Sequence, residues 1–325
     1  MALPQSIDFH AHVMVPKIGE LLASSGRPAP EEDNTHNRHL METVYRAAFG
    51  QLERRFETME RTAIEMQVIS TTPMHYNYWA PPDLADKIVA AANEYIADMC
   101  HDHPDKFVGL GAVALQHPEL APKHVADAMR LGLKGVEIST MAAGIELDDR
   151  RLEAFWSAAQ EHDAVVFIHP SGCTLGARVA KYYLNNVIGN PLDTTIALTN
   201  LIFGGVLERY PRLKIVAAHG GGYLPSYFSR SMHGYEVRPE CQDIPHAPDH
   251  YLHRNIWVDN LVYEPENVGH IVRVMGASRV VLGTDYPYDM GQDTPVAVLD
   301  KITDLSAEDR ELITAKNAIG LLKLG

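Results

Sequence analysis

The sequence predicts an α/β fold, a (β/α)8 TIM barrel with an insertion after its first strand. The chain has 325 residues, which suits one barrel of about 250 residues with added segments. Short apolar segments alternate with longer amphipathic ones eight times along the chain. Segments such as 165–168 and 280–282 are wholly apolar, as expected of parallel strands that helices cover on both faces.

The predicted elements follow in a regular order. Strands are expected at 7–12, 66–70, 107–115, 133–139, 164–169, 213–219, 256–260 and 279–285. Helices are expected at 52–66, 83–101, 118–131, 150–162 and 265–275, with a largely helical stretch before 210 and a capped helix from 306. The alternative is an open doubly wound sheet. A Gly-x-Gly-x-x-Gly turn after a strand would favour it, and the sequence has none.

A long polar excursion, residues 13–51, follows the first predicted strand, and prolines and acidic residues at 28–34 predict a loop in its middle. A connection of this length in a compact domain is usually functional or disordered. We therefore expect a single domain over 1–325, with the insertion near the mouth of the active site, where it would shape specificity.

The composition argues against several kinds of partner and location. The net charge is −14 and the pI about 5.6, without a basic cluster, so nucleic acid is not an expected partner. No apolar run is long enough for a membrane span, and the first six residues leave no room for a signal peptide. Cys100, Cys173 and Cys241 show neither a disulfide framework nor zinc spacing. A cytoplasmic protein is expected.

The first strand carries a candidate metal site. His10 and His12 lie two residues apart on it, so their side chains point to the same face. Two imidazoles on one strand can bind the same ion. On its own this pattern is weak, because the chain has 17 histidines.

Three other predicted strands end in residues that bind metals, His169, His219 and Asp285. In a TIM barrel the chemistry lies at the carboxyl ends of the strands, so these residues are expected to meet His10 and His12 there. Three imidazoles and a carboxylate suit zinc, and manganese also fits. We predict His10, His12, His169 and Asp285 as ligands and His219 as a general acid/base beside a bound water. In the alternative, His219 is a ligand and Asp285 the catalytic base.

A second metal ion would need a bridging ligand, usually a carboxylated lysine at the end of the fourth strand. Here Lys134 lies at the other end of that strand, and Glu137 near its carboxyl end could equally be a polar residue that supports a ligand or is solvated. A single metal ion is therefore favoured.

The chain resembles the amidohydrolase superfamily, in the branch of metal-dependent decarboxylases typified by α-amino-β-carboxymuconate-ε-semialdehyde decarboxylase. The resemblance covers nearly the whole chain. It depends on the motifs Asp8-Phe9-His10-Ala11-His12, Thr72-Pro73, His169-Pro170, Ala218-His219-Gly220-Gly221-Gly222 and Gly283-Thr284-Asp285-Tyr286-Pro287. It implies a mononuclear zinc on the four predicted ligands, an acid/base at the His219 position, and non-oxidative decarboxylation of an aromatic or unsaturated, muconate-like acid.

The resemblance also suggests how a small-molecule carboxylic acid would be held. In this branch two arginines hold a substrate carboxylate, one of them donated by the neighbouring subunit. Arg230 matches one of the two, whereas the other falls near Glu42, for which Arg38 or Arg46 would have to substitute. This departure argues against the substrate that is typical of the branch. Cross-subunit use of Arg230 predicts a homodimer or higher homo-oligomer, with residues 226–239 at the interface.

Tyr288 matches an aromatic pocket position of the branch, and Trp79 is a second candidate for an aromatic-binding pocket. The branch includes hydratases and hydrolases. The alternative function is therefore a metal-dependent hydrolase or hydratase of a ring-cleavage product or lactone. A non-catalytic metal-binding scaffold is a third possibility.

Overall fold

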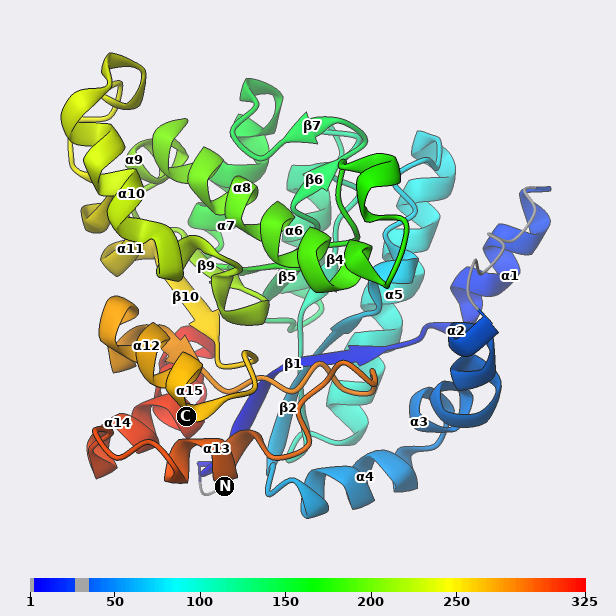
Figure 1. Ribbon diagram of the computed structural model, residues 1–325. Coiled ribbons are helices and arrows are strands. Elements are labelled where there is room, and N and C mark those ends of the chain that lie inside the picture. Colours follow the sequence, from blue (N-terminus) through cyan, green and yellow to red (C-terminus); the bar gives the residue numbers. More distant parts are fainter. Residues whose placement is uncertain (1–2, 27–34) are drawn as a thin grey trace.

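The computed structural model describes residues 3–26 and 35–325, and its strands lie at the centre of the fold with helices around them (Figure 1). The strands that form the central sheets are β1 (Ile7–Val13), β2 (Met66–Thr71), β3 (Phe107–Gly109), β4 (Gly111–Ala112), β5 (Gly135–Ile138), β8 (Val165–Ile168), β9 (Lys214–Ala217), β10 (Ile256–Asp259) and β11 (Val280–Val281). All neighbouring pairs among them run parallel.

The strands follow one another around a barrel in chain order. One sheet has the order β1-β2-β3 and the other β11-β10-β9-β8-β5-β4. β3 and β4 are two parts of one predicted strand, separated by Leu110, whose N–H bonds the carbonyl of Ile69 at 2.9 Å. At the other edge, parallel bridges pair Asp8 with Leu282 and Ala11 with Tyr286. The predicted (β/α)8 barrel is confirmed.

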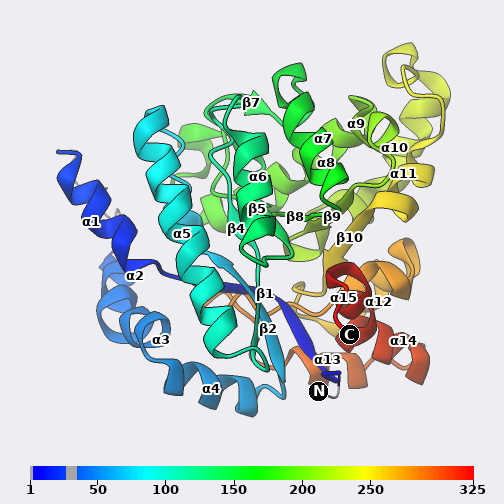
Figure 2. The ribbon, with the colours of Figure 1, turned by 180° about the vertical axis from the view of Figure 1, so that it is seen from behind.

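The helices cover the outside of the barrel, as Figure 2 shows from behind. They are α4 (Leu52–Arg61), α5 (Pro82–Asp102), α6 (Ala121–Arg130), α7 (Glu153–Glu161), α8 (Asn190–Phe203), α9 (Val206–Arg209), α10 (Leu224–Val237), α11 (Pro248–Asn255), α12 (Pro265–Met275), α13 (Pro295–Asp300), α14 (Ala307–Glu311) and α15 (Asn317–Leu322). The predicted cap at residue 306 is confirmed, because Ser306 and Asp309 form a reciprocal capping box. None of the described helices is long and apolar enough to cross a membrane.

The insertion after β1 is more helical than its polar sequence suggests. It contains α1 (Pro16–Ser24), α2 (Thr35–Leu40), a π-helical turn η1 (Met41–Tyr45) and α3 (Arg46–Gly50). The predicted loop at 28–34 lies outside the described residues. The segment docks on the barrel through two buried aromatic side chains, Tyr45 and Phe49, which pack against Tyr288 with ring centroids 5.3 and 5.9 Å away.

Several strands end earlier than predicted, because the chain turns into the loops that carry the site. The strand predicted at 279–285 is a regular strand only at Val280–Val281, and beyond it the chain pairs with β1 through single bridges at Leu282 and Tyr286. After β5, a short antiparallel hairpin of β6 (Met141–Ala142) and β7 (Ile145–Glu146) was not expected. Inside the barrel, Phe9 and Phe167 are buried with ring centroids 6.1 Å apart and form the floor under the site.

Candidate metal centre

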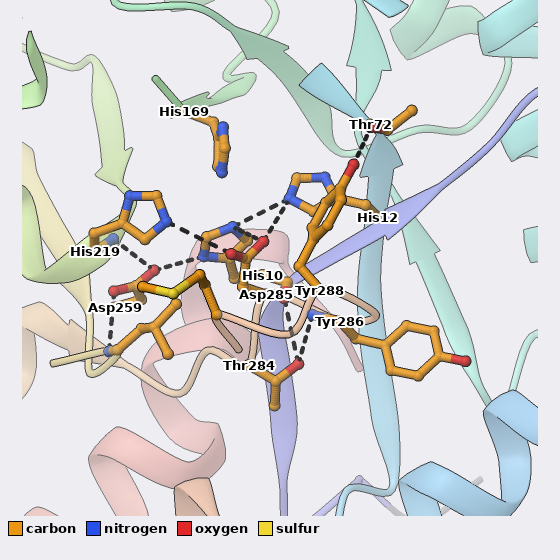
Figure 3. A network of polar contacts seen from close by, with 12 residues as sticks. His10, His12, Thr72, His169, His219, Asp259, Thr284, Asp285, Tyr286 and Tyr288 are labelled. Atoms are coloured by element: carbon orange, nitrogen blue, oxygen red, sulfur yellow. Dashed lines mark hydrogen bonds and ion pairs between the residues drawn. The ribbon is translucent and has the colours of Figure 1, made fainter. Parts of the chain in front are cut away.

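The centre is built on β1, where His10 and His12 point to the same side as predicted (Figure 3). Both side chains are fully buried, and their Nε2 atoms lie 3.2 Å apart. The second nitrogen of each ring is already bound. His10 Nδ1 lies 2.8 Å from Asp259 Oδ2, and His12 Nδ1 lies 3.1 Å from the carbonyl oxygen of Thr71. Each ring is thus held with Nε2 directed into the centre, as metal-binding histidines usually are.

The other three predicted residues converge on the same point. His169 follows β8, His219 follows β9, and Asp285 follows β11. The ligand atoms of His10, His169, His219 and Asp285 all lie within 4.8 Å of one another. His12 is outside that set of four, yet its Nε2 atom is 3.2 Å from Asp285 Oδ1. The structure therefore brings all five residues together.

Unpartnered buried atoms support a metal ion here. Both ring nitrogens of His169 are buried without a hydrogen-bond partner among the described residues. Oδ1 of Asp285 is also buried and accepts no hydrogen bond from them, although the Nε2 atoms of His10 and His12 lie 3.3 and 3.2 Å away. A buried polar atom without a partner costs free energy. A divalent cation would satisfy a ring nitrogen of His169 and Oδ1 of Asp285 at once, and imidazole and carboxylate are ligands that zinc and manganese accept. The residues present fit such an ion.

The electrostatics of the centre favour an ionised carboxylate. Burial alone would raise the pKa of Asp285, but His10 and the neighbouring imidazoles hold that pKa well below its usual range. Burial lowers the pKa of His10, but Asp285 and Asp259 outweigh this effect and raise the pKa to about 10. Burial, together with His12 and His10, keeps the pKa of His169 well below its usual value. His169 is thus a neutral imidazole, the form that binds metals.

Asp259, the last residue of β10, was not among the predicted site residues. Its carboxylate accepts hydrogen bonds from the backbone N–H groups of His219 at 3.0 Å, Gly220 at 2.7 Å and Leu261 at 3.1 Å, as well as contacting His10. The signal was present, because Asp259 ends a strand whose other three residues, Ile256, Trp257 and Val258, are apolar, and a buried aspartate in such a place needs a partner. Asp259 fixes both the ring of His10 and the turn that carries His219.

The turn after β9 needs its glycines. His219 itself has a positive φ of 55°, and Gly220, Gly221 and Gly222 follow with φ of 65°, 73° and 66°. A Cβ atom on Gly222 would lie 2.1 Å from the carbonyl oxygen of Pro191 in α8. The motif therefore lets the chain turn sharply against α8 and places the imidazole of His219 over the centre.

The sequence also did not predict a second buried network of hydrogen bonds, which lies below the centre. Arg55 of α4 is 1% exposed and donates to the carbonyl of His12 at 2.5 Å and to Gln67 Oε1 at 2.9 Å. Gln67 in turn donates to Asp8, which also accepts from the hydroxyl of Thr284 at 2.6 Å. The network ties α4, β1, β2 and the loop of Asp285 together.

The predicted substrate residues lie at different distances from the centre. Tyr288 packs on His12 with ring centroids 5.7 Å apart, and its hydroxyl contacts that of Thr72 (Figure 3). Trp79 is 41% exposed and donates to Asn77. Arg230 is exposed on α10 and lines a separate hollow beside Tyr227. Within one chain, Arg230 does not meet the centre.

A cavity of about 320 Å³ opens beside the centre and reaches His219 and Asp285. Its walls come from the segment before α8, from α10 and α12, and from the loops after β10 and β11. The polar side chains that line it include Asn186, Asn190, Tyr223, Ser226, Asn267 and His270. The side chain of His219 is 16% exposed, whereas His10 and His12 are fully buried, so His219 is the imidazole that a ligand in the cavity would meet.

The fold and the centre define a (β/α)8-barrel enzyme of the kind that depends on a divalent metal ion. A family model described as amidohydrolase matches residues 7–324, and the chain belongs to that family.

One relative, the 2-amino-3-carboxymuconate-6-semialdehyde decarboxylase of Dictyostelium discoideum, is 34% identical over 273 residues, which are 83% of this chain and 76% of the relative. Two solved structures share the fold. The 5-carboxyvanillate decarboxylase of Sphingomonas paucimobilis has a TM-score of 0.88 at 19% identity, with 100% of each chain covered. The same enzyme from Novosphingobium aromaticivorans, as a mutant with bound manganese, has a TM-score of 0.87 at 24% identity, with 99% of this chain and 97% of that chain covered.

Proposed function

We propose that this protein is a metal-dependent decarboxylase that removes carbon dioxide, without oxidation, from an aromatic or unsaturated carboxylic acid. The observation that carries the proposal is the convergence of four imidazoles and one carboxylate at the carboxyl end of the barrel, beside a cavity. The named relatives support the reaction type, since all three are decarboxylases of carboxylic acids.

His10, His12, His169 and Asp285 would hold a single ion, zinc or manganese. When bound, such an ion polarises an oxygen of the acid and stabilises the negative charge that develops as the carboxylate leaves. The fully buried positions of His10 and His12 support their assignment as ligands. The greater exposure of His219, and its Nε2 atom at 3.8 Å from Asp285 Oδ2, support a different role for that residue.

His219 would act as the general acid/base. It delivers a proton to the ring or chain carbon that bears the carboxylate, the bond between that carbon and the carboxylate breaks, and carbon dioxide leaves. The electrons of the broken bond return to the conjugated system of the substrate. Asp285 would orient the imidazole of His219 through its second oxygen while it serves as a ligand. If His219 is a ligand instead, Asp285 is the catalytic base.

Contacts to the substrate are proposed for three residues. Tyr288 is the best placed, because its ring covers His12 at the edge of the centre. Trp79 is 41% exposed, so the loop after β2 would have to move its side chain toward the metal centre before it could contact the substrate. Arg230 would act only in a homo-oligomer. Tyr227, which lines the same hollow as Arg230 and is 68% exposed, supports an interface on this face. A strictly monomeric and fully active protein in light scattering would refute the oligomer.

The test is the mass of the product. Protein loaded with zinc or manganese would be incubated with hydroxylated aromatic acids, carboxymuconate semialdehydes and related lactones. Loss of carbon dioxide from any of them establishes the decarboxylase. Addition of water instead would identify a hydrolase or hydratase that uses the same centre.

The free state of Cys100, Cys173 and Cys241 supports the proposal that the reaction takes place in the cytoplasm.

A further inference from the structure

The turn that carries Asp285 depends on contacts with other parts of the chain. Asp285 has a φ of 60°, a left-handed conformation that costs free energy for residues other than glycine. Its N–H donates to the carbonyl of His10 at 2.8 Å, and its carbonyl accepts from the N–H of Tyr288 at 2.9 Å. The first bond fixes one end of the turn to β1. The other end, at Tyr288 and Asp289, is in contact with the insertion.

The hydroxyl of Tyr45 makes two hydrogen bonds to the far end of this turn. It donates to Oδ1 of Asp289 at 2.7 Å and accepts from the backbone N–H of the same residue at 3.1 Å. Both the side chain and the backbone of Asp289 are therefore fixed. Tyr45 is 5% exposed, so water competes little for these bonds. His36 also lies 3.6 Å from Oδ2 of Asp289, but both of those side chains are exposed, and such pairs contribute little.

The ring of Tyr45 supports the same turn through Tyr288. The ring centroids of Tyr45 and Phe49 lie 5.3 and 5.9 Å from that of Tyr288. Tyr288 in turn packs on His12 at 5.7 Å, and Figure 3 shows its ring beside His12 with the hydroxyl at Thr72. The insertion thus reaches His12 through the ring of Tyr288 and Asp285 through the backbone of the turn.

The position of Asp285 matters because metal ligands must be spaced closely. Its Oδ1 atom lies 3.3 and 3.2 Å from the Nε2 atoms of His10 and His12. Distances from ligand to ion are usually fixed within about 0.2 Å. A turn released at Asp289 would hold the carboxylate in the correct place for only part of the time, and metal affinity would fall by that fraction.

We propose that Tyr45 is a positioning residue for the metal centre. It holds the turn that carries Asp285, so that docking of segment 41–50 on the barrel and binding of the ion strengthen each other. Tyr45 itself touches neither the ion nor the reacting atoms. The inference rests on the proposed function in taking Asp285 as a ligand.

The test removes one hydroxyl. Tyr45→Phe keeps the ring on Tyr288 and loses both bonds to Asp289. Zinc affinity of the full chain would be measured by competition with a chelator. We expect Tyr45→Phe to bind zinc at least about fivefold more weakly than the wild type, the lower end of coupling between linked sites. Equal affinities would overturn the inference and leave the proposed function standing.

A matched control separates positioning from a general loss of stability. Tyr251 is fully buried on α11, and its hydroxyl donates to Oε2 of Glu208 at 3.1 Å, away from the centre. Tyr251→Phe should lower the free energy of unfolding but leave zinc affinity unchanged. An equal loss of zinc affinity in the two variants would contradict a role specific to Tyr45.

The route through Asp289 is tested by a double-mutant cycle. Asp289→Ala removes the acceptor of the Tyr45 hydroxyl. If both variants break one contact, the double variant should lose less zinc affinity than the two single losses combined. Losses that simply add would show that Tyr45 does not act through Asp289, and the inference would be wrong.

The coupling must also act in reverse, because linkage between two sites is reciprocal. Zinc should slow hydrogen exchange of the backbone amides of residues 41–50 in the wild type, and much less in Tyr45→Phe. Exchange in the wild type that zinc does not change would overturn the inference. The predicted differences in a protein that releases no carbon dioxide from any acid would contradict the proposed function alone. Absence of zinc binding in the wild type would contradict both.

Discussion

The Nδ1 atom of His10 lies 2.8 Å from Oδ2 of Asp259, so the end of β10 fixes the orientation of a metal ligand on β1. The same carboxylate accepts the backbone N–H of His219, the proposed acid/base, at 3.0 Å. One side chain thus sets the position of two functional groups on different strands. This arrangement is the carboxylate–histidine pair that commonly supports a metal ligand.

Replacement of this carboxylate tests its supporting role. Asp259→Asn keeps the size of the side chain but replaces one carboxylate oxygen by an NH2 group. Only one of its two terminal atoms can then accept hydrogen bonds from His10 or from the backbone N–H groups. We expect metal affinity to fall about 10- to 100-fold, the usual cost of losing such a partner. Competition with a chelator would measure the affinity. Asp304→Asn, on the exposed surface, is the matched control, and equal affinity in the two variants would contradict the role.

His219 can be separated from the ligands by its own variant. His219→Ala should keep one metal ion per chain and lose about 10²- to 10⁴-fold in turnover, the range of general acid–base catalysis. Replacement of a proposed ligand, His169→Ala, should instead abolish both metal binding and turnover. Metal analysis and turnover on the same samples would distinguish them. Loss of the ion from His219→Ala would support the alternative in which His219 is a ligand and Asp285 the base.

Arg55 is expected to hold the site together rather than to take part in catalysis. Arg55→Met leaves the carbonyl of His12 and Oε1 of Gln67 without their buried donor. We expect the free energy of unfolding to fall by about 2–4 kcal/mol. Urea denaturation would measure it. Arg54→Met is the control, because the side chain of Arg54 is exposed and donates only to Gln51 among the described residues. A difference below about 0.5 kcal/mol between the two would refute the role.

Metal affinity should depend on pH through His10. Burial lowers its pKa, but Asp285 and Asp259 raise it to about 10 in the metal-free protein. A proton therefore occupies His10 at neutral pH, and a metal ion must displace it. Affinity should rise by up to about tenfold per pH unit below pH 10 and level off above it. Chelator competition at several pH values, corrected for protonation of the chelator, would show this slope. An affinity independent of pH would mean that the ion does not bind His10.

The barrel could be predicted because its signal is periodic and repeated. Every strand has a run of apolar residues, and the predicted metal and acid/base residues lie on, at the end of or just beyond such runs, whereas the predicted substrate residues Arg230 and Trp79 do not. The convergence of His10, His12, His169, His219 and Asp285 follows from barrel geometry alone. Which of the five are ligands does not follow, because the sequence holds no distances.

Two supporting residues were missed for different reasons. Asp259 ends β10 just as Asp285 follows β11, so the same rule could have found it. Arg55 looks like its neighbour Arg54, although it lies three residues after Leu52 and four before Met59, on the buried side of α4. From sequence alone, an arginine next to the apolar face of a helix is usually expected to be solvated. Only the contacts with His12 and Gln67 show that this one is buried with partners.

The insertion shows the limit of composition. Its polar sequence predicted an excursion, and the described part is largely helical and docks through a few buried residues, the aromatic Tyr45 and Phe49 and the aliphatic Val15 and Ile18. Tyr45 donates to Asp289 at 2.7 Å and so reaches the loop that carries Asp285. Such long-range contacts have no signal in a local pattern.

The central claim is tested most directly by the product formed in heavy water from a substrate identified in the panel. With metal-loaded protein, the account predicts loss of carbon dioxide and gain of one deuterium at the carbon that carried the carboxylate. Chelation should abolish the product, and added zinc or manganese should restore it. A product that has gained the elements of water and kept its carboxylate would contradict the account, as would full turnover in protein shown to contain no metal.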